Sequence, residues 1–188
     1  PAHPWVSRGG VKLAHALDAL RYDVAGCVCL DVGASTGGFT DVLLARGAAR
    51  VYAVDVGSGQ LHARLRTHPR VASLERTDIR ALERARLDPA PSLATVDVSF
   101  ISLKAVLPSV VALMRPPARL VALVKPQFEV GRAHLKKGIV RDAALQEAAC
   151  EEIAACLRAL GLTVAKILPS PIRGGDGNAE FFIGAARD

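Results

Sequence analysis

The sequence has few aromatic residues and lacks the long apolar stretches of a membrane protein. Only 4% of the 188 residues are aromatic, so a hydrophobic core must be built mainly from alanine, valine and leucine. No apolar run approaches the ~18 uncharged residues that a membrane-spanning helix needs, and the chain does not open on the pattern of a signal peptide. These absences predict a soluble, cytoplasmic protein that does not act at a membrane.

Cysteine is also scarce, and its spacing does not predict a metal site. The cysteines are Cys27, Cys29, Cys150 and Cys156. Neither Cys-x-Cys nor a pair six residues apart on a helical stretch matches a zinc ligand set. We therefore expect reduced thiols in the core and no bound metal.

The length and the charge of the chain predict one domain that could bind an anionic partner. A chain of 188 residues, 51% of them hydrophobic, favours a single domain over residues 1–188, which would bury roughly 70% of its unfolded surface. Lysine and arginine number 24 against 18 acidic residues, which gives a formal net charge of +6. Such a surplus suits nucleic acid or another phosphate-rich partner without requiring one.

Apolar runs of strand length alternate with helical patterns, which is typical of an α/β domain with a largely parallel sheet. Helices are expected over residues 7–22, 39–47 and 142–161, the last with Asp142 as its N-cap. Strands are expected to end at Gly33, at Asp55, near Asp78, at Asp97 and at Lys125. Two further strands are joined only by the glycine-rich loop 173–178, so they should be antiparallel. We expect about seven mostly parallel strands with an antiparallel terminal strand and helices on both faces.

A glycine-rich turn follows the first of these strands. The segment DVGASTGGFT places Gly33, Gly37 and Gly38 between a strand and a helix, where a missing Cβ lets the backbone approach a ligand. Asp55 lies 22 residues after Gly33, in the position of a carboxylate that binds a ribose diol. Ser35 stands where a dinucleotide motif would have its second glycine. These features alone fit NAD, FAD or S-adenosylmethionine.

Two other aspartates favour S-adenosylmethionine. Asp31 precedes the turn, where it would repel a pyrophosphate but attract the amino group of a methionine moiety. Asp78 could accept a hydrogen bond from the amino group of adenine. Any one of these acids could be a loop or cap residue, but that is a poor explanation for aspartates at four consecutive strand ends. The expected sheet is also the layout of the S-adenosylmethionine-dependent methyltransferases.

The residues after the fourth and fifth strands indicate which kind of atom is methylated. Amino-methylating enzymes usually carry prolines after the fourth strand, whereas this chain has DVSF at Asp97–Phe100. Base-carbon methylation needs a nucleophilic cysteine at that edge, and none of the thiols lies there. The edge instead offers Lys125, which could act on a hydroxyl group if its surroundings lower its pKa. Phe128 and Glu129 then begin a loop that could cover the substrate.

Six motifs carry a resemblance to a known family. In order they are WVSRGGVKL, LDVGASTGGFTDVLL, DVGSGQL, DVSFISLKAVLP, LVKPQFEVG and GNAEFF. Together they resemble the TlyA (hemolysin A) family of rRNA 2′-O-methyltransferases, relatives of the FtsJ/RrmJ methyltransferases, over nearly the whole chain. The resemblance implies that ribosomal RNA is the substrate, with a cytidine as the target. It also implies a Lys-Asp-Lys-Glu catalytic tetrad at Lys12, Asp97, Lys125 and Glu180, in which Lys125 activates the 2′-hydroxyl.

The resemblance further implies S-adenosylmethionine as the cofactor. The residues expected to bind it are Asp31, Gly33, Ser35, Thr36, Gly37, Gly38, Asp55, Asp78 and Asp97. Family members usually carry an N-terminal S4-like RNA-binding domain ahead of a tryptophan-containing linker. Residues 1–6 resemble the end of that linker, so we expect a single FtsJ-like methyltransferase domain from which the RNA-binding domain is absent.

Two clusters of basic residues are candidates for RNA contact. The first contains Arg64, Arg66 and Arg70, followed by Arg76 and Arg80, and the second contains Arg132, Lys136 and Lys137. Phosphate contacts from such side chains give an affinity that falls with salt and carry no sequence information. Each of these residues could equally lie on a solvated face.

Two other functions remain open at this point. The chain could be a non-catalytic RNA-binding or ribosome-assembly module, which would bind RNA without methylating it. The name hemolysin suggests a membrane-lytic protein, but the sequence shows no secretion signal, lytic amphipathic helix or apolar hairpin. Nothing in the sequence specifies an oligomeric state.

Overall fold

A seven-stranded sheet forms the centre of the structure. The computed structural model describes residues 3–188 of the chain. The strands are β1 Val28–Val32, β2 Arg50–Val54, β3 Val71–Leu74, β4 Leu93–Val96, β5 Ala118–Val124, β6 Thr163–Pro169 and β7 Phe181–Arg187. They follow the order β3-β2-β1-β4-β5-β7-β6 across the sheet. Strands β1 to β5 are parallel and β7 is antiparallel to both of its neighbours, which confirms the expected topology.

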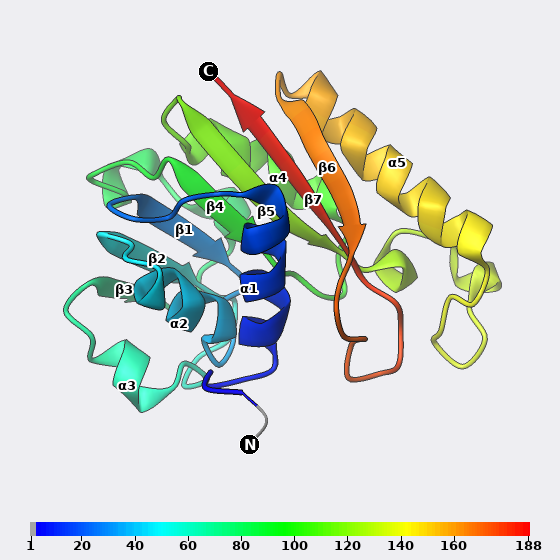
Figure 1. The fold of residues 1–188 in the computed structure, drawn as a ribbon, viewed down its shortest axis with the longest axis horizontal. Helices are drawn as coiled ribbons and strands as arrows, with labels where there is room; N and C mark the ends of the chain where they lie inside the picture. The colour runs from blue at the N-terminus through cyan, green and yellow to red at the C-terminus, as the bar shows by residue number, and fades with distance from the viewer. Residues whose placement is uncertain (1–2) are drawn as a thin grey trace.

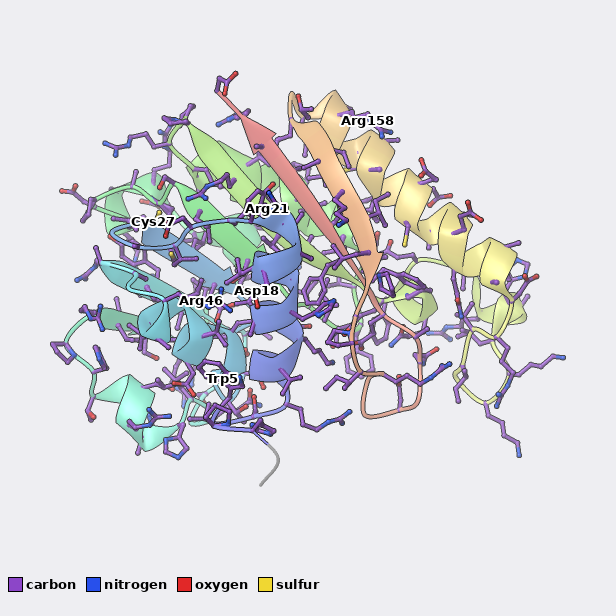
Figure 2. All side chains as sticks on the ribbon, in the orientation of Figure 1. Trp5, Asp18, Arg21, Cys27, Arg46 and Arg158 are labelled. Carbon is purple, nitrogen blue, oxygen red and sulfur yellow. The ribbon has the colours of Figure 1, made fainter. Side chains whose placement is uncertain are left out.

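Helices cover both faces of this sheet. On one face lie α1 Gly9–Leu20, α2 Gly38–Ala45 and the short α3 Ala63–Arg66, and on the other lie α4 Leu103–Leu113 and α5 Ala143–Ala159. Figure 1 shows α1 and α2 in front of the sheet and α4 behind it. Asp18 of α1 and Arg46, just after α2, face each other in an ion pair at 2.7 Å (Figure 2). Short 3₁₀ turns lie in the loops: η1 Ile79–Ala81, η2 Arg84–Arg86, η3 Pro126–Phe128 and η4 Arg132–His134.

Each face of the sheet has its own apolar core, and aliphatic side chains dominate both. On the face of α4 and α5, Leu107, Leu120 and Ile153 are completely buried. On the face of α1 and α2, the ring of Phe182 lies 6.3 Å from that of Phe39, centroid to centroid. Because full burial of an aliphatic side chain contributes ~1.5–3 kcal/mol, a chain with few aromatic residues can still form a stable core.

Most expected elements are found, with two corrections. The predicted end of the third strand near Asp78 is wrong, because β3 ends at Leu74. Asp78 instead caps η1, where its side chain accepts a hydrogen bond from Arg80 N at 2.9 Å. The sequence pattern also does not predict α4, since Pro108 lies inside this helix and proline normally ends one. Asp142 is the N-cap of α5, as expected.

The segment that precedes α1 is docked against the helices. The indole of Trp5 lies against Gly10, so closely that a Cβ built on Gly10 would lie 2.3 Å from Cγ of Trp5. The backbone N–H of Val6 donates a hydrogen bond to Oδ2 of Asp41 in α2 at 2.9 Å. Figure 2 shows Trp5 close to the start of α1. Residues 1–2 of the expected linker remnant lie outside the described residues, and the assignment of residues 1–6 to a linker stays a prediction.

The described part of the chain contains neither a membrane-spanning helix nor a cluster of metal ligands. No helix within residues 3–188 is long and apolar enough to cross a membrane. The same residues include no group of three or more histidine, cysteine or acidic side chains that could hold a metal ion. The cysteines are free, and burial raises the pKa of Cys29 to about 12, so this thiol stays protonated at neutral pH.

Gly10→Ala is expected to displace Trp5. The added methyl group would overlap the indole, and overpacking of this kind costs ~1–3 kcal/mol, more than the ~1 kcal/mol that alanine gains over glycine in a helix. Trp5 is the one tryptophan of the chain, so its fluorescence should shift to longer wavelength as the melting temperature falls. Gly9→Ala is the control, because its Cβ would meet the ring of Phe39 at 3.6 Å, an ordinary contact. Identical emission spectra for the two variants would contradict the packing.

Candidate active site

A cavity of about 460 Å³ lies at the carboxyl edge of the parallel strands. The predicted site residues that line it are Gly33, Ser35, Asp55, Asp78, Asp97 and Lys125. Ligands of open α/β sheets bind outside this edge, and the volume lies within the range of ~300–1,000 Å³ that small-molecule sites occupy. Three of the polar strand ends predicted from the sequence, at Asp55, Asp97 and Lys125, therefore meet at one cavity.

Backbone N–H groups hold the carboxylate of Asp55 just after β2. Ser35 N donates a hydrogen bond to Oδ2 at 2.7 Å, and Gly57 N donates one to Oδ1 at 2.8 Å. A carboxylate oxygen has two lone pairs, so each oxygen of Asp55 can accept a further bond. Asp55 is thus fixed on the cavity wall in a position to bind the hydroxyl groups of a ligand.

The glycines of the first turn make room for other parts of the protein, and their expected contact with a ligand stays a prediction. A Cβ on Gly33 would lie 1.9 Å from the carbonyl oxygen of Asp97, and a Cβ on Gly37 would lie 2.3 Å from a leucine of α3. Both glycines have a left-handed backbone, with φ of +82° and +105°. Of the residues predicted in this turn, Gly33 and Ser35 line the cavity, whereas Thr36, Gly37 and Gly38 do not.

Asp31 is completely buried in β1 and does not line the cavity. Its two oxygens accept hydrogen bonds from the hydroxyl groups of Thr40 at 2.7 Å and Thr95 at 3.0 Å. Burial raises the pKa of Asp31 to about 7, against the lowering effect of these hydroxyl groups and with a smaller raising effect of Asp97 and Asp55. The carboxyl group therefore joins β1 to α2 and β4, and its contact with a cofactor stays a prediction.

Asp78 and Arg80 form a planar ion pair on the cavity wall. Nε of Arg80 lies 3.1 Å from Oδ1 and Nη2 lies 2.7 Å from Oδ2, the two-point geometry that a guanidinium makes with a carboxylate. Hydrogen bonds from Arg80 lower the pKa of Asp78 to about 2, so its carboxylate is charged at neutral pH. Arg80, which the sequence groups with the first basic cluster, thus lies beside the cavity and is paired.

Lys125 and Asp97 form an ion pair where β5 and β4 end. Nζ of Lys125 lies 2.6 Å from Oδ1 of Asp97 and donates a hydrogen bond to Oγ of Ser99 at 2.8 Å. The side chains of Lys125 and Asp97 are 13% and 25% exposed, and both line the cavity. Ser99 was not singled out from the sequence, although it lies in the DVSF motif. The ammonium group is thus held at the cavity wall by a charge and a hydroxyl.

Glu180 and Lys12 form a second ion pair beside the first. Nζ of Lys12 lies 2.6 Å from Oε1 of Glu180, and the two side chains are 12% and 4% exposed. Phe181, the first residue of β7, pairs with Val124, the last residue of β5. Lys125 follows this pair on one strand and Glu180 precedes it on the other, so the antiparallel register sets them side by side. The structure thus brings together the residues predicted as a tetrad, Lys12, Asp97, Lys125 and Glu180.

An exposed aromatic side chain stands at the mouth of the cavity. Phe100 lines the cavity, is 90% exposed and has a left-handed backbone with φ of +63°, which is unfavourable for a bulky residue. Its ring lies 5.0 Å from that of Phe128, centroid to centroid. Glu129 accepts hydrogen bonds from Ser102 Oγ at 2.6 Å and Leu103 N at 2.8 Å. The loops that follow β4 and β5 are therefore joined at this point.

The two basic clusters predicted from the sequence differ in what their side chains contact. Arg64 pairs with a nearly buried aspartate of α2 at 3.2 Å, and Arg66 and Arg70 donate to main-chain carbonyl groups at 2.7 and 2.8 Å. The side chains of Arg132, Lys136 and Lys137 are exposed and make no hydrogen bond or ion pair within residues 3–188. Within residues 3–188, the three cations of the second cluster therefore have no partner in the protein, whereas of the first cluster only Arg76 is exposed without one.

The sheet order, the antiparallel β7 and the acid-lined cavity define the Rossmann-like fold of the S-adenosylmethionine-dependent methyltransferases. Magnesium protoporphyrin IX methyltransferase of Synechocystis, solved with bound S-adenosylmethionine, has the same fold with a TM-score of 0.65, at 16% identity over 96% of this chain and 81% of that chain. A family model described as FtsJ-like methyltransferase matches residues 5–187, and the chain belongs to that family.

Closer relatives support the resemblance seen in the six motifs. The chain is 48% identical over 180 residues to the 16S/23S rRNA (cytidine-2′-O)-methyltransferase TlyA of Mycobacterium tuberculosis, covering 95% of this chain and 67% of that protein. A structure from Streptococcus thermophilus, named "putative hemolysin", matches with a TM-score of 0.96 at 44% identity, covering 100% of this chain and 68% of that one. The predicted resemblance to the TlyA (hemolysin A) family is confirmed.

The buried carboxyl group of Asp31 predicts how stability depends on pH. Its pKa of about 7 in the folded state lies above the ordinary value of 3.8, so the folded state binds this proton more tightly. The contribution of Asp31 to the free energy of unfolding should therefore fall as the pH rises from about 4 to about 7. Asp31→Asn removes the titration. The free energy of unfolding of the variant minus that of the wild type should therefore be about 2–3 kcal/mol larger at pH 8 than at pH 5, measured by urea unfolding. A difference that is equal at both pH values would contradict the raised pKa.

Proposed function

We propose that this chain transfers a methyl group from S-adenosylmethionine to the 2′-hydroxyl of a cytidine in ribosomal RNA. The observation that carries the proposal is a pair of neighbouring ion pairs at the strand ends: Lys125 with Asp97, which line the acid-lined cavity, and Lys12 with Glu180, which the strand register sets beside them. The printed name of the M. tuberculosis relative supplies the substrate and the target nucleotide. A cytoplasmic location, which access to ribosomal RNA requires, stays a prediction.

The residues of the cavity fit S-adenosylmethionine. Asp55, held by two backbone N–H groups, would accept the ribose hydroxyls, and Asp78 would accept the adenine amino group. The carboxylates that line the cavity suit a cationic ligand and disfavour a pyrophosphate. When bound, the cofactor supplies a methyl group on a positively charged sulfur. Gly33 and Ser35 would contact it directly, and the other residues predicted for the turn would act by shaping it: Asp31, Thr36, Gly37 and Gly38.

Lys125 would activate the acceptor hydroxyl. A ribose hydroxyl is a weak acid, so methyl transfer needs its proton removed, or the developing alkoxide stabilised, as the new bond forms. The Lys125 ammonium donates one hydrogen bond to Ser99 and lies 2.6 Å from Oδ1 of Asp97, and with three N–H groups it can still donate to the acceptor oxygen. Lys12 and Glu180 neutralise each other beside it, so no unpaired charge is buried when RNA covers the site.

The surroundings of the cavity suit an unpaired nucleotide. The exposed ring of Phe100 offers a face on which an unstacked base can lie. The second basic cluster, at Arg132, Lys136 and Lys137, follows Lys125 in the chain and carries free cations that suit phosphates. We therefore place RNA contact at the second cluster first. Contact at Arg64, Arg66 and Arg70 remains a weaker proposal, because their side chains are already bonded within the protein.

Replacing Lys125 tests the proposed chemistry. In the full-length protein, Lys125→Ala should lower kcat for methyl transfer to ribosomal RNA by ~10²–10⁴-fold, because it removes the group that acts on the proton. The affinity for S-adenosylmethionine should change little. Transfer of a labelled methyl group gives the rate, and mass spectrometry of nucleosides identifies 2′-O-methylcytidine. Lys166→Ala is the matched control, since Lys166 lies exposed on β6.

Other products would identify the other candidate functions. RNA binding without methyl transfer by the wild-type protein would indicate a non-catalytic RNA-binding module. A base-methylated nucleoside would refute the ribose assignment. Release of dye from lipid vesicles would support the membrane-lytic alternative.

Lys136→Ala tests the second basic cluster. Loss of one phosphate contact should weaken RNA binding and reduce the slope of log affinity against log salt concentration by about 1, measured by fluorescence anisotropy over a salt series. Arg158→Ala removes the same charge from the far end of α5 (Figure 2) and should leave the slope unchanged. An equal change in both variants would assign the effect to net charge.

A further inference from the structure

A buried polar side chain connects the candidate active site to the segment that carries the free cations. This segment, residues 132–141, is called here the basic hairpin, since an antiparallel bridge joins Lys136 and Ile139. Hydrogen bonds join it to the loop between β6 and β7. Asn178 of that loop is only 1% exposed and lies two residues before Glu180. The contact between hairpin and loop therefore adjoins the predicted tetrad.

Asn178 uses its whole amide group in this contact. Oδ1 accepts a hydrogen bond from Val140 N at 3.0 Å, and Nδ2 donates one to the carbonyl oxygen of Gly138 at 3.0 Å. Nδ2 also donates to Oδ2 of Asp176 at 2.8 Å. A flipped amide would set nitrogen against an N–H group and oxygen against two acceptors, so only one orientation satisfies these groups. Among the amino acids, only asparagine combines a side chain of this size with an amide donor and an amide acceptor.

The network continues to the segment that follows Lys125. Nε2 of Gln127 donates to Oδ2 of Asp176 at 3.2 Å, and Oδ1 of Asp176 accepts from the backbone N–H of Asn178 at 2.9 Å. Gln127 is 8% exposed and lies in η3, two residues after Lys125. Burial alone would raise the pKa of Asp176, but hydrogen bonds from Asn178 and Gln127 lower it, so this carboxylate is charged at neutral pH. Asp176 thus links the segments that carry Lys125 and Glu180.

We infer that Asn178 is a positioning residue, which sets the place of the basic hairpin relative to Lys125. The inference rests on the proposed function. A hairpin with free cations can bind phosphates in many orientations, but it directs the target ribose only if its distance from Lys125 is fixed. Misplacement of reacting atoms by ~1 Å can cost ~10²-fold in rate. A residue with this role should therefore affect kcat more than RNA affinity.

Asn178→Ala in the full-length protein tests the inference. The kcat for 2′-O-methyl transfer should fall ~10–100-fold, while the KM for ribosomal RNA and the Kd of S-adenosylmethionine, measured by calorimetry, stay within ~3-fold of the wild type. Hydrogen exchange in residues 132–141 should become faster. Ser170→Ala is the control in the same loop, because the Ser170 hydroxyl is buried without a partner among the described residues. Its kcat should equal that of the wild type.

Gln127→Glu is the second variant, and it decides the question if Asn178→Ala does not fold. It keeps the shape of the side chain but sets a carboxylate against Asp176, so kcat should fall while the bonds between Asn178 and the hairpin remain. A kcat within about twofold of the wild type in folded variants would overturn the inference. The inference would also be overturned if the affinity for S-adenosylmethionine fell as much as kcat, because that result indicates a general loss of structure. If the wild-type protein itself makes no 2′-O-methylated nucleotide, both the proposed function and the inference fail.

Discussion

The antiparallel pairing of β7 with β5 is the constraint on which the candidate active site depends. Because β7 runs opposite to β5, its first residue lies at the edge where β5 ends, and Glu180 comes to lie beside Lys125. A slip of one residue would turn every side chain of β7 to the other face of the sheet. Phe182 packs in the core of one face and Ile183 in the core of the other. The packing of both cores therefore maintains the register that aligns the charged residues.

The charges at this edge are arranged in two pairs with different surroundings. Lys125 and Asp97 line the cavity, whereas Lys12 and Glu180 do not, and Glu180 is more deeply covered than Asp97. Buried charges are tolerated when they are paired, so each lysine has its own acid. This arrangement lets the outer pair face a ligand while the inner pair keeps the strand ends in place. Asp55 and Asp78 add negative charge elsewhere on the lining of the same cavity.

Much of the fold could be predicted from the sequence, because buried parallel strands are apolar runs that end in polar residues. The end of β3 and the helix α4 could not, since Asp78 follows a polar segment without regular pairing and Pro108 lies within α4. The burial of Asp31 was also not predictable. Asp31 and Asp55 stand in similar motifs, but Asp31 points between β4 and α2, where only the folded chain supplies Thr95 and Thr40.

Contacts between distant segments explain most of what the sequence could not show at the site. Asp97 and Lys125 could be predicted from their places at strand ends, whereas Lys12 and Glu180 were predictable only through motif resemblance, because they lie in α1 and just before β7. The partner of Arg70 is a main-chain carbonyl 22 positions away, and nothing in either segment marks the contact. The same applies to the contact between Asn178 and the basic hairpin, since Asn178 and its partner Val140 are 38 positions apart. Hydrogen bonds of this kind leave no periodic signal in a sequence.

The place of β7 in the sheet has a consequence for the way the protein matures. β7 lies between β5 and β6, although both precede it in the chain, and β6 has β7 as its one neighbour in the sheet. During synthesis β6 must therefore wait without a strand partner, and Lys12 waits without its acid, until residues 181–187 leave the ribosome. The pairing of β5 with β7, which joins Val124 to Phe181, is distant in sequence, and pairings of that kind form slowly. The nascent enzyme thus gains its assembled charge cluster in the same late event that closes the sheet.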